Sequence, residues 1–136
     1  MSRKKAREAV MIHFYQMEIH QEFDYSENFK ERYEGVLEDP REVSYALELI
    51  RQFTRNKGAV DELINRYSDN WTVKRMAKVD LSILRLSITE MLFARNVPGS
   101  ISINEAVNLS KTYSDEDGYK FVNGLLGKIL RSETSG

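Results

Sequence analysis

The sequence predicts an all-α protein, a compact bundle of about seven helices. Apolar residues recur at three- and four-residue steps along most of the 136 residues, and the strict alternation typical of half-buried strands is almost absent. Only two prolines interrupt the chain, and no repeat of solenoid length occurs. A chain of this length can bury one core without disulfides or metal, so residues 1–136 are expected to form a single domain.

The first two expected helices are defined by apolar stripes and by the serines that precede them. Ser2 can cap the first helix, whose pattern fades near Phe23, and Ser26 begins the second, which ends before Pro40. The side chains expected in the core are Ala6, Val10, Phe14, Met17, Phe29, Tyr33, Val36 and Leu37.

A third helix is expected to open at Asp39-Pro40-Arg41-Glu42. This segment combines a capping side chain, a proline at the first helical position and an acidic side chain in the first turn. Gly58 marks a break or bend before a fourth helix that ends at the polar residues 68–70. Trp71 is the largest side chain available to anchor this junction.

The second half of the chain carries further start signals. Thr72 is expected to cap a short turn, and Asp80 the next long helix. Residues 97–100 predict a loop, followed by two capping boxes at 102–105 and 114–117, each opening a helix. Gly124 and Gly127 lie inside the last helix, where each glycine costs about 1 kcal/mol relative to alanine, so another helix is expected to approach closely there.

Composition excludes several classes of function. The chain has no cysteine, which excludes disulfides, thiolate metal sites and thiol nucleophiles. With 20 basic and 21 acidic side chains the net charge is -1, so a nucleic-acid site would have to be local. The basic start lacks the apolar region of a signal peptide, and no run of eighteen apolar residues occurs. We expect a soluble, cytoplasmic protein without a membrane segment.

Basic residues crowd the start of the first helix, at Arg3, Lys4, Lys5 and Arg7. Such a run is commonly a solvated terminus. However, the N-terminal end of a helix dipole disfavours exposed cations by roughly 0.3–1 kcal/mol each, and no acidic side chain precedes Glu8. Phosphates docked on this helix end would reverse that penalty, which favours a nucleic-acid site.

Cations and aromatic rings also alternate on both sides of the last capping box, in residues 111–113 and 119–121. Single-stranded RNA needs both groups, because unstacked bases pack on rings while lysines neutralise phosphates. The alternative is that these rings belong to the core, above all Phe121, which lies on the apolar stripe of its helix.

No catalytic, metal or cofactor motif is found. Residues 115–118 lack the alternating oxygen ligands and distal glutamate of an EF-hand, and helix capping explains them better. His13 and His20 have no carboxylate at the spacing of a metal triad and are interpreted as structural. We therefore expect a protein without enzymatic activity, metal or cofactor.

Three segments together resemble one known family. They are residues 71–92 (WTVKRMAKVDLSILRLSITEML), residues 97–106, and residues 120–126 (KFVNGLL). The chain resembles the NusB family of bacterial transcription antitermination factors from Arg3 to about Leu130. The resemblance implies two small helical subdomains, at about 1–70 and 71–132.

The resemblance also implies a function and its partners. NusB-like proteins pair with NusE, a ribosomal small-subunit protein, and the pair binds single-stranded boxA RNA in nascent ribosomal RNA leaders, within the antitermination complex of RNA polymerase. Two residues are implied to meet the partner protein, namely Tyr15 and Asp80. The resemblance implies RNA contacts at Arg3, Lys4, Lys5 and Arg7 and at Tyr113, Asp117, Lys120 and Phe121. With Lys111, which lies beside the aromatic rings described above, these residues form the expected RNA-binding set.

Two alternatives and one departure from the family pattern stay open. The same architecture occurs as the N-terminal domain of ribosomal RNA methyltransferases, so the chain could be a protein-interaction module, and relatives differ in whether they form homodimers. Where relatives often carry a run of arginines, residues 3–5 read Arg-Lys-Lys. Lysine lacks the two-pronged fork of arginine, so we expect RNA binding that is weaker or more dependent on the partner.

Overall fold

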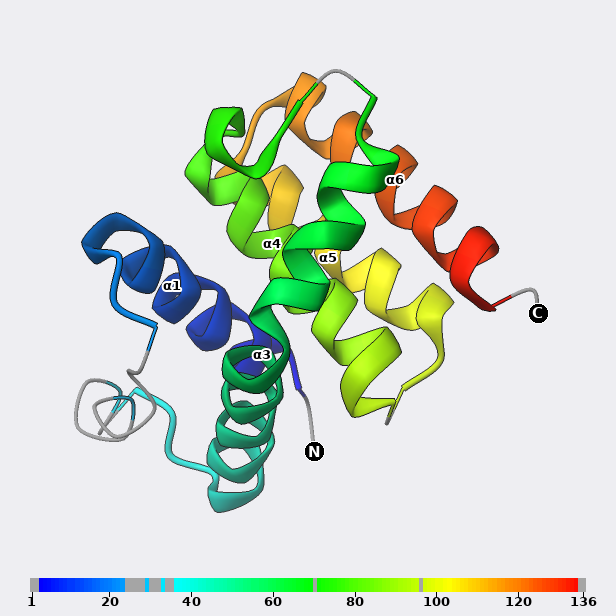
Figure 1. The fold of residues 1–136 in the computed structure, drawn as a ribbon. Coiled ribbons are helices and arrows are strands. Elements are labelled where there is room, and N and C mark those ends of the chain that lie inside the picture. The colour runs from blue at the N-terminus through cyan, green and yellow to red at the C-terminus, as the bar shows by residue number, and fades with distance from the viewer. Residues whose placement is uncertain are drawn as a thin grey trace.

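The structure is a computed structural model that describes residues 3–23, 29, 33, 36–69, 71–95 and 97–134. These residues form helices and no strand, which confirms the all-α prediction (Figure 1). They contain five α-helices rather than about seven. The α-helices are α1 (Lys4–His20), α3 (Pro40–Tyr67), α4 (Lys78–Ile88), α5 (Gly99–Tyr113) and α6 (Glu116–Thr134), with a 3₁₀ turn η2 (Val73–Arg75) and a π-helical segment η3 (Thr89–Ala94).

The third and fourth expected helices are one continuous helix, α3, so the prediction of two helices is wrong. The bend lies at Asn56 (φ −118°, ψ 17°), two residues before Gly58. The side-chain amide of Asn56 donates to the carbonyl oxygen of Gln52 at 2.7 Å, which is the acceptor that a regular helix offers to a backbone N–H. A side chain that competes for the backbone ladder bends a helix without ending it.

The second expected helix falls mostly outside the described residues, as does the expected cap Ser2. Phe29, Tyr33 and Leu37 are buried as expected, but Val36 is 68% exposed, so its placement in the core is wrong. The backbone N–H groups of Val36 and Leu37 both donate to the carbonyl of Tyr33, in a tight turn. Adjacent residues of such a turn point in different directions, and Leu37 takes the core-facing one.

Helix α4 occupies the middle of the molecule, between α1 and the pair α5 and α6 (Figure 1). Every residue from Leu81 to Ile88 is buried, as expected for a helix surrounded by others. Among them is Arg85, whose guanidinium donates to both carboxylate oxygens of Asp61 on α3, at 2.9 and 2.8 Å, and to Glu18 on α1 at 2.6 Å. The core therefore contains a charged cluster that ties three helices together.

Helix starts match the sequence signals only in part. Asp39 caps α3 as expected, since its carboxylate accepts the backbone N–H of Arg41 at 2.9 Å. Asp80 is not a cap, because α4 begins two residues earlier and Ala77 is the N-cap residue. Thr72 takes the N-cap position of η2 without a side-chain hydrogen bond.

The two capping boxes are also displaced. Helix α5 begins at Gly99, so Ser102 lies inside it, is buried and bonds to Glu90 instead of opening a helix. The loop expected at residues 97–100 is correspondingly shorter. At α6 the capping side chain is Asp115, which accepts the backbone N–H of Gly118 at 2.7 Å, whereas the hydroxyl of Ser114 donates to Asp80.

Glycines and the tryptophan depart from expectation too. Apart from its chain neighbours and its own helix backbone, nothing described lies within 4 Å of the Cβ position of Gly124, and Gly127 meets only the end of Arg131. The expected close approach of another helix there is therefore wrong. That close approach occurs at Gly99, where a Cβ would lie 2.6 Å from a methyl carbon of Leu130. Trp71 is 51% exposed, so it does not anchor the junction.

Candidate nucleic-acid interface

Arg7, one of the four basic residues expected to contact RNA at the start of α1, is buried in an ion pair. Its Nε lies 2.9 Å from one carboxylate oxygen of Glu90 and 3.1 Å from the other, and its residue exposure is 6%. Glu90 also accepts the hydroxyl groups of Ser102, at 2.7 Å, and of Tyr45. This network, the Glu90 cluster, joins α1, α3, η3 and α5. Arg7 therefore holds the start of α1 against the core and does not face solvent.

Arg3 lies at the surface beside the same cluster. Its guanidinium is 4.2 Å from the centre of the Tyr45 ring, within the range of a cation–π contact. Burial raises the pKa of Tyr45, and the hydrogen bond to the Glu90 carboxylate raises it further, so the phenol stays a neutral donor. Lys4 and Lys5 are exposed. The solvent-facing cations at the start of α1 are thus residues 3–5.

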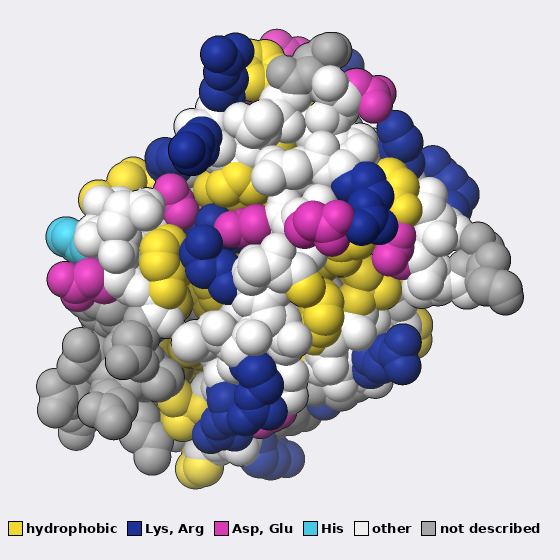
Figure 2. Space-filling view, viewed as in Figure 1, with side chains coloured by type: hydrophobic (Ala, Val, Ile, Leu, Met, Phe, Trp, Pro, Cys, Tyr) yellow, Lys and Arg dark blue, Asp and Glu magenta, His cyan; other side chains and the backbone are white. Residues whose placement is uncertain are grey.

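Arginines of α3 extend this basic region. Arg3, Arg41 and Arg51 line one hollow of about 390 Å³, together with Tyr45. Figure 2 shows Lys and Arg side chains gathered over the lower part of α3. Arg41 and Arg51 were not among the expected contacts, because they are spread along a helix and each has an acidic side chain nearby, Asp39 or Glu48.

A hydrogen bond joins the two sequence regions expected to bind RNA. The hydroxyl of Tyr113, at the end of α5, donates to a carboxylate oxygen of Glu8 at 2.8 Å. Glu8 lies one helical turn from Lys4 and Lys5. This bond to Glu8 raises the pKa of Tyr113, with a smaller contribution from burial. Residues 105 positions apart are therefore neighbours on the surface.

The aromatic residues near the last helix start are arranged differently from one another. The ammonium of Lys111 lies 5.4 Å from the centre of the Tyr119 ring, so this ring serves as a platform for a cation. Phe121 is half-buried, which places its ring between the core and the surface. Tyr113 is exposed at 40%.

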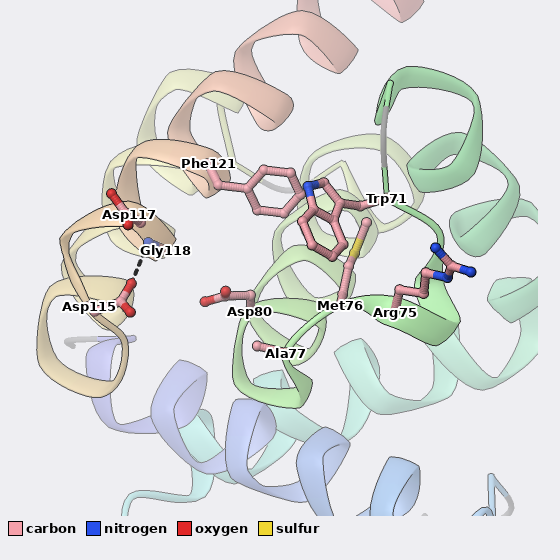
Figure 3. A pocket seen from close by; sticks show the side chains of 9 residues that line it. All are labelled: Trp71, Arg75, Met76, Ala77, Asp80, Asp115, Asp117, Gly118 and Phe121. Carbon is pink, nitrogen blue, oxygen red and sulfur yellow. Dashed lines mark hydrogen bonds between the residues drawn. The ribbon is translucent and has the colours of Figure 1, made fainter.

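Phe121 and Asp117 line one hollow of about 390 Å³, which Figure 3 shows from close by. The hollow lies between the start of α6, the turn η2 and the first turn of α4. Phe121 and Trp71 turn their rings toward each other at one end, and the carboxylates of Asp80, Asp115 and Asp117 lie toward the other. A hollow with aromatic rings at one end and carboxylates at the other suits a flat apolar ring that carries hydrogen-bond donors. The carboxylates would repel a phosphate group.

Lys120 is not among the residues that line this hollow, but it lines a neighbouring one. Its ammonium pairs with Glu116 at 3.0 Å, and both side chains are more than 60% exposed. Exposed pairs of this kind contribute only about 0–1 kcal/mol, so the ammonium can exchange Glu116 for another anion.

The two residues expected at a protein partner lie on different helices. Tyr15 is half-buried on α1, and Asp80 is in the first turn of α4, where its carboxylate accepts the hydroxyl of Ser114 at 2.7 Å. Helices α1 and α4 pack against each other. Asp80 also lines the hollow of Figure 3, so the expected partner face adjoins Asp117 and Phe121.

Sequence reasoning missed Trp71 and Arg75 at this hollow. A tryptophan is usually largely buried, which led to its assignment to a helix junction. The available signal was its surroundings, because residues 68–70 and Thr72 are all polar.

Within residues 3–134, leaving aside those not described, no group of three or more His, Asp or Glu side chains is arranged to hold a metal ion. None of the helices described is long and apolar enough to cross a membrane.

The fold and surface together define a class, an all-helical domain whose surface combines cations with exposed aromatic rings. A profile of the NusB family matches residues 4–131, and the chain belongs to this family of transcription antitermination factors. The transcription antitermination protein NusB of Alkaliphilus oremlandii is 37% identical, over 98% of this chain and 96% of its own length. That of Clostridium perfringens is 40% identical, over 97% and 98%.

Solved structures agree with the family assignment. NusB of T. maritima superposes with a TM-score of 0.88 at 32% identity, over 96% of this chain and 92% of its own. A crystal structure of the antitermination factors NusB and NusE in complex with double-stranded RNA gives a TM-score of 0.86 at 28% identity, over 96% of both chains. The resemblance noted from the sequence is thereby confirmed.

Proposed function

We propose that this antitermination factor binds single-stranded boxA-type RNA of nascent ribosomal RNA leaders together with NusE, within the complex that lets RNA polymerase read through terminators. Two findings support the partners. Close relatives carry the name of an antitermination protein, and one structural neighbour was solved with NusE and RNA. The RNA of that neighbour is double-stranded. A single strand is proposed here because exposed rings need unstacked bases, which a duplex does not offer.

The observation that carries this proposal is the hydrogen bond between Tyr113 and Glu8, which brings the basic start of α1 beside the aromatic end of α5. One flexible strand can then contact both regions. Arg3, Lys4 and Lys5 would neutralise backbone phosphates at one end of its path. Lys111 and Lys120 would do so at the other, while Tyr113 and Phe121 stack with bases.

Two expected contacts take more specific roles in this proposal. Asp117, next to Phe121 in the hollow of Figure 3, accepts hydrogen bonds from amino groups on a base edge, because a carboxylate would repel phosphate. Arg7 forms a buried ion pair with Glu90, so it acts by positioning the start of α1 and not by touching RNA.

NusE is proposed to bind where Tyr15 and Asp80 lie, on the packed helices α1 and α4. Because Asp80 lines the same hollow as Asp117 and Phe121, a partner seated there would border the RNA. With this geometry, binding of NusE would strengthen binding of RNA and the reverse. The gain would compensate for the weaker grip on phosphate of the lysines at positions 4 and 5.

The test is a titration of the full chain with a boxA-like oligoribonucleotide and with a scrambled one, each with and without NusE. The proposal expects preferential binding of the boxA-like RNA, strengthened by NusE. Lys5→Gln should lower the salt dependence of binding by about one unit of slope. Arg55→Gln, which removes one exposed charge from α3, is the matched control and should leave it unchanged.

Equal and weak binding of both RNAs under every condition would refute the RNA-binding function. If NusE bound normally in that case, the chain would instead be the protein-interaction module that the sequence left open.

A further inference from the structure

Another hollow, of about 350 Å³, adjoins the hollow of Figure 3 and shares Trp71 and Phe121 with it. Its size falls within the roughly 300–1,000 Å³ typical of small-molecule sites. It lies where the end of α3 meets the middle of α6. The residues that matter for its chemistry are Ser68, Trp71, Lys120, Phe121, Gly124 and Lys128.

Trp71 forms one wall, with its ring turned toward that of Phe121 (Figure 3). A tryptophan that is 51% exposed is unusual, because this side chain contributes most when it is covered. The ring lines both hollows. A flat aromatic surface bordering two hollows is suited to stacking with a nucleobase, and every base offers such a face.

Gly124 lies in the middle of α6 and lines the same hollow. A glycine inside a helix is unfavourable, and close packing often explains it, but here a Cβ would meet nothing within 4 Å beyond its chain neighbours and its own helix backbone. Packing within this chain therefore does not account for the glycine. The missing side chain leaves the helix surface open, so that another molecule can approach the backbone closely.

Ser68 supplies an independent observation. It is only 8% exposed, and its hydroxyl has no hydrogen-bond partner among the described residues. A buried polar group without a partner is unfavourable, and such groups call for a ligand or another explanation. The hydroxyl can both donate and accept, so either kind of polar group on a nucleotide would satisfy it.

Two lysines border the hollow. Lys120 pairs with Glu116 at 3.0 Å and Lys128 with Asp69 at 3.4 Å, and all four side chains are at least 44% exposed. Exposed pairs of this kind are weak, so both ammonium groups can turn to a phosphate.

We propose that this hollow is a nucleotide subsite for single-stranded RNA. The base stacks on Trp71, the strand passes over Gly124, and the two lysines hold the neighbouring phosphates. The hydroxyl of Ser68, which is covered in this structure, turns toward the nucleotide to gain its missing hydrogen bond. The inference rests on the proposed RNA-binding function. It extends the RNA path beyond the residues expected from the sequence, by four that were not in that set: Ser68, Trp71, Gly124 and Lys128.

Fluorescence gives a direct readout, because Trp71 is the only tryptophan of the chain. Titrating the full chain with the boxA-like oligoribonucleotide should quench the emission of Trp71 along the same curve as binding measured by anisotropy of labelled RNA. Trp71→Ala should weaken RNA binding by roughly five- to a hundredfold, the range of a lost stacked base. Trp71→Phe, which keeps a ring, should recover part of that loss.

Glycine substitutions separate binding from folding. Gly124→Ala and Gly58→Ala both replace a helical glycine whose Cβ position is open, so both should raise the melting temperature by a few degrees. Only Gly124→Ala adds a methyl group inside the hollow, so only it should weaken RNA binding. A more stable variant that binds RNA less well cannot be explained by loss of the fold.

The outcomes are distinguishable. Normal RNA affinity in both Trp71→Ala and Gly124→Ala, with unchanged tryptophan emission in the wild-type chain, would overturn the subsite and leave the proposed function standing. No selective RNA binding by the wild-type chain, with NusE present, would overturn both.

Discussion

Basic residues at the start of α1 lie in two different environments, the buried Glu90 cluster and the protein surface. In the Glu90 cluster, Arg7 is enclosed and paired with a buried carboxylate. At the surface, within four residues of Arg7, Lys4 and Lys5 are exposed and the N-cap residue Arg3 is partly exposed beside Tyr45. The difference shows that a basic run at a helix start is not one functional unit. One member holds the helix in place while its neighbours remain accessible to a ligand.

The largest expected effect separates these groups by stability. Arg7→Ala leaves the buried Glu90 carboxylate without its cation, and breaking a buried pair costs about 3–5 kcal/mol. The free energy of unfolding should fall by that amount in urea denaturation, whereas Lys5→Gln should change it by less than about 0.5 kcal/mol. An Arg7→Ala variant that was fully stable but had lost RNA binding would place Arg7 among the direct contacts.

A smaller loss is expected at the start of α6. A Cβ on Gly118 would collide with the hydroxyl of Ser114 and approach Asp80 to 3.0 Å, which disturbs the hydrogen bond between these two side chains. Gly118→Ala should therefore destabilise the fold by about 1–3 kcal/mol, as overpacking does. Gly124→Ala is the control, because it should stabilise. Thermal unfolding of both variants measures this, and equal melting temperatures would show that the start of α6 yields easily.

Acid should lower the stability contributed by the buried cluster of Arg85, Asp61 and Glu18. Burial alone would raise the pKa of Glu18, but the hydrogen bonds and positive charges of Arg85 and Lys78 outweigh it and lower the pKa below its usual 4.5. A lowered pKa in the folded state contributes stability above about pH 4.5, and this stability is lost as pH falls through the folded value.

Glu18→Gln removes this titration, so it should flatten the loss of stability below about pH 4.5. Urea denaturation at several pH values measures the slope. A slope identical to that of the wild-type chain would mean that Glu18 titrates alike in both states.

The smallest expected effect on stability belongs to the surface. Lys120→Gln breaks only an exposed pair with Glu116, so the free energy of unfolding should change by less than about 0.5 kcal/mol. The same variant should bind RNA with less dependence on salt, because the slope of log affinity against log salt should fall by about one. A Lys120→Gln variant with an unchanged salt slope would remove this lysine from the RNA path.

Local patterns in the sequence predicted the fold class and many helix faces, because helical periodicity reports directly which side is buried. These patterns failed where a residue distant in the sequence determines the role of a side chain. Arg7 and Glu90 are 83 positions apart, so the sequence around Arg7 does not indicate its ion pair. Ser102 follows the pattern of a capping box, yet its hydroxyl is taken up by Glu90 inside the core.

The candidate site was predicted unevenly for the same reason. Charge and ring types pointed to the start of α1 and to residues 111–121, and the bond from Tyr113 to Glu8 joins them. Trp71 and Gly124 were interpreted through their usual structural roles, burial and close packing. Only the three-dimensional surroundings showed that neither role applies.

The central claim is that one RNA strand contacts both the basic start of α1 and the aromatic region of residues 111–121. Photocrosslinking with a single boxA-like oligoribonucleotide, followed by peptide mapping of the full chain with NusE, tests it most directly. The account predicts crosslinks in both regions from the same oligonucleotide, lost together when the RNA is scrambled. Crosslinks confined to one region, or unchanged with scrambled RNA, would contradict it.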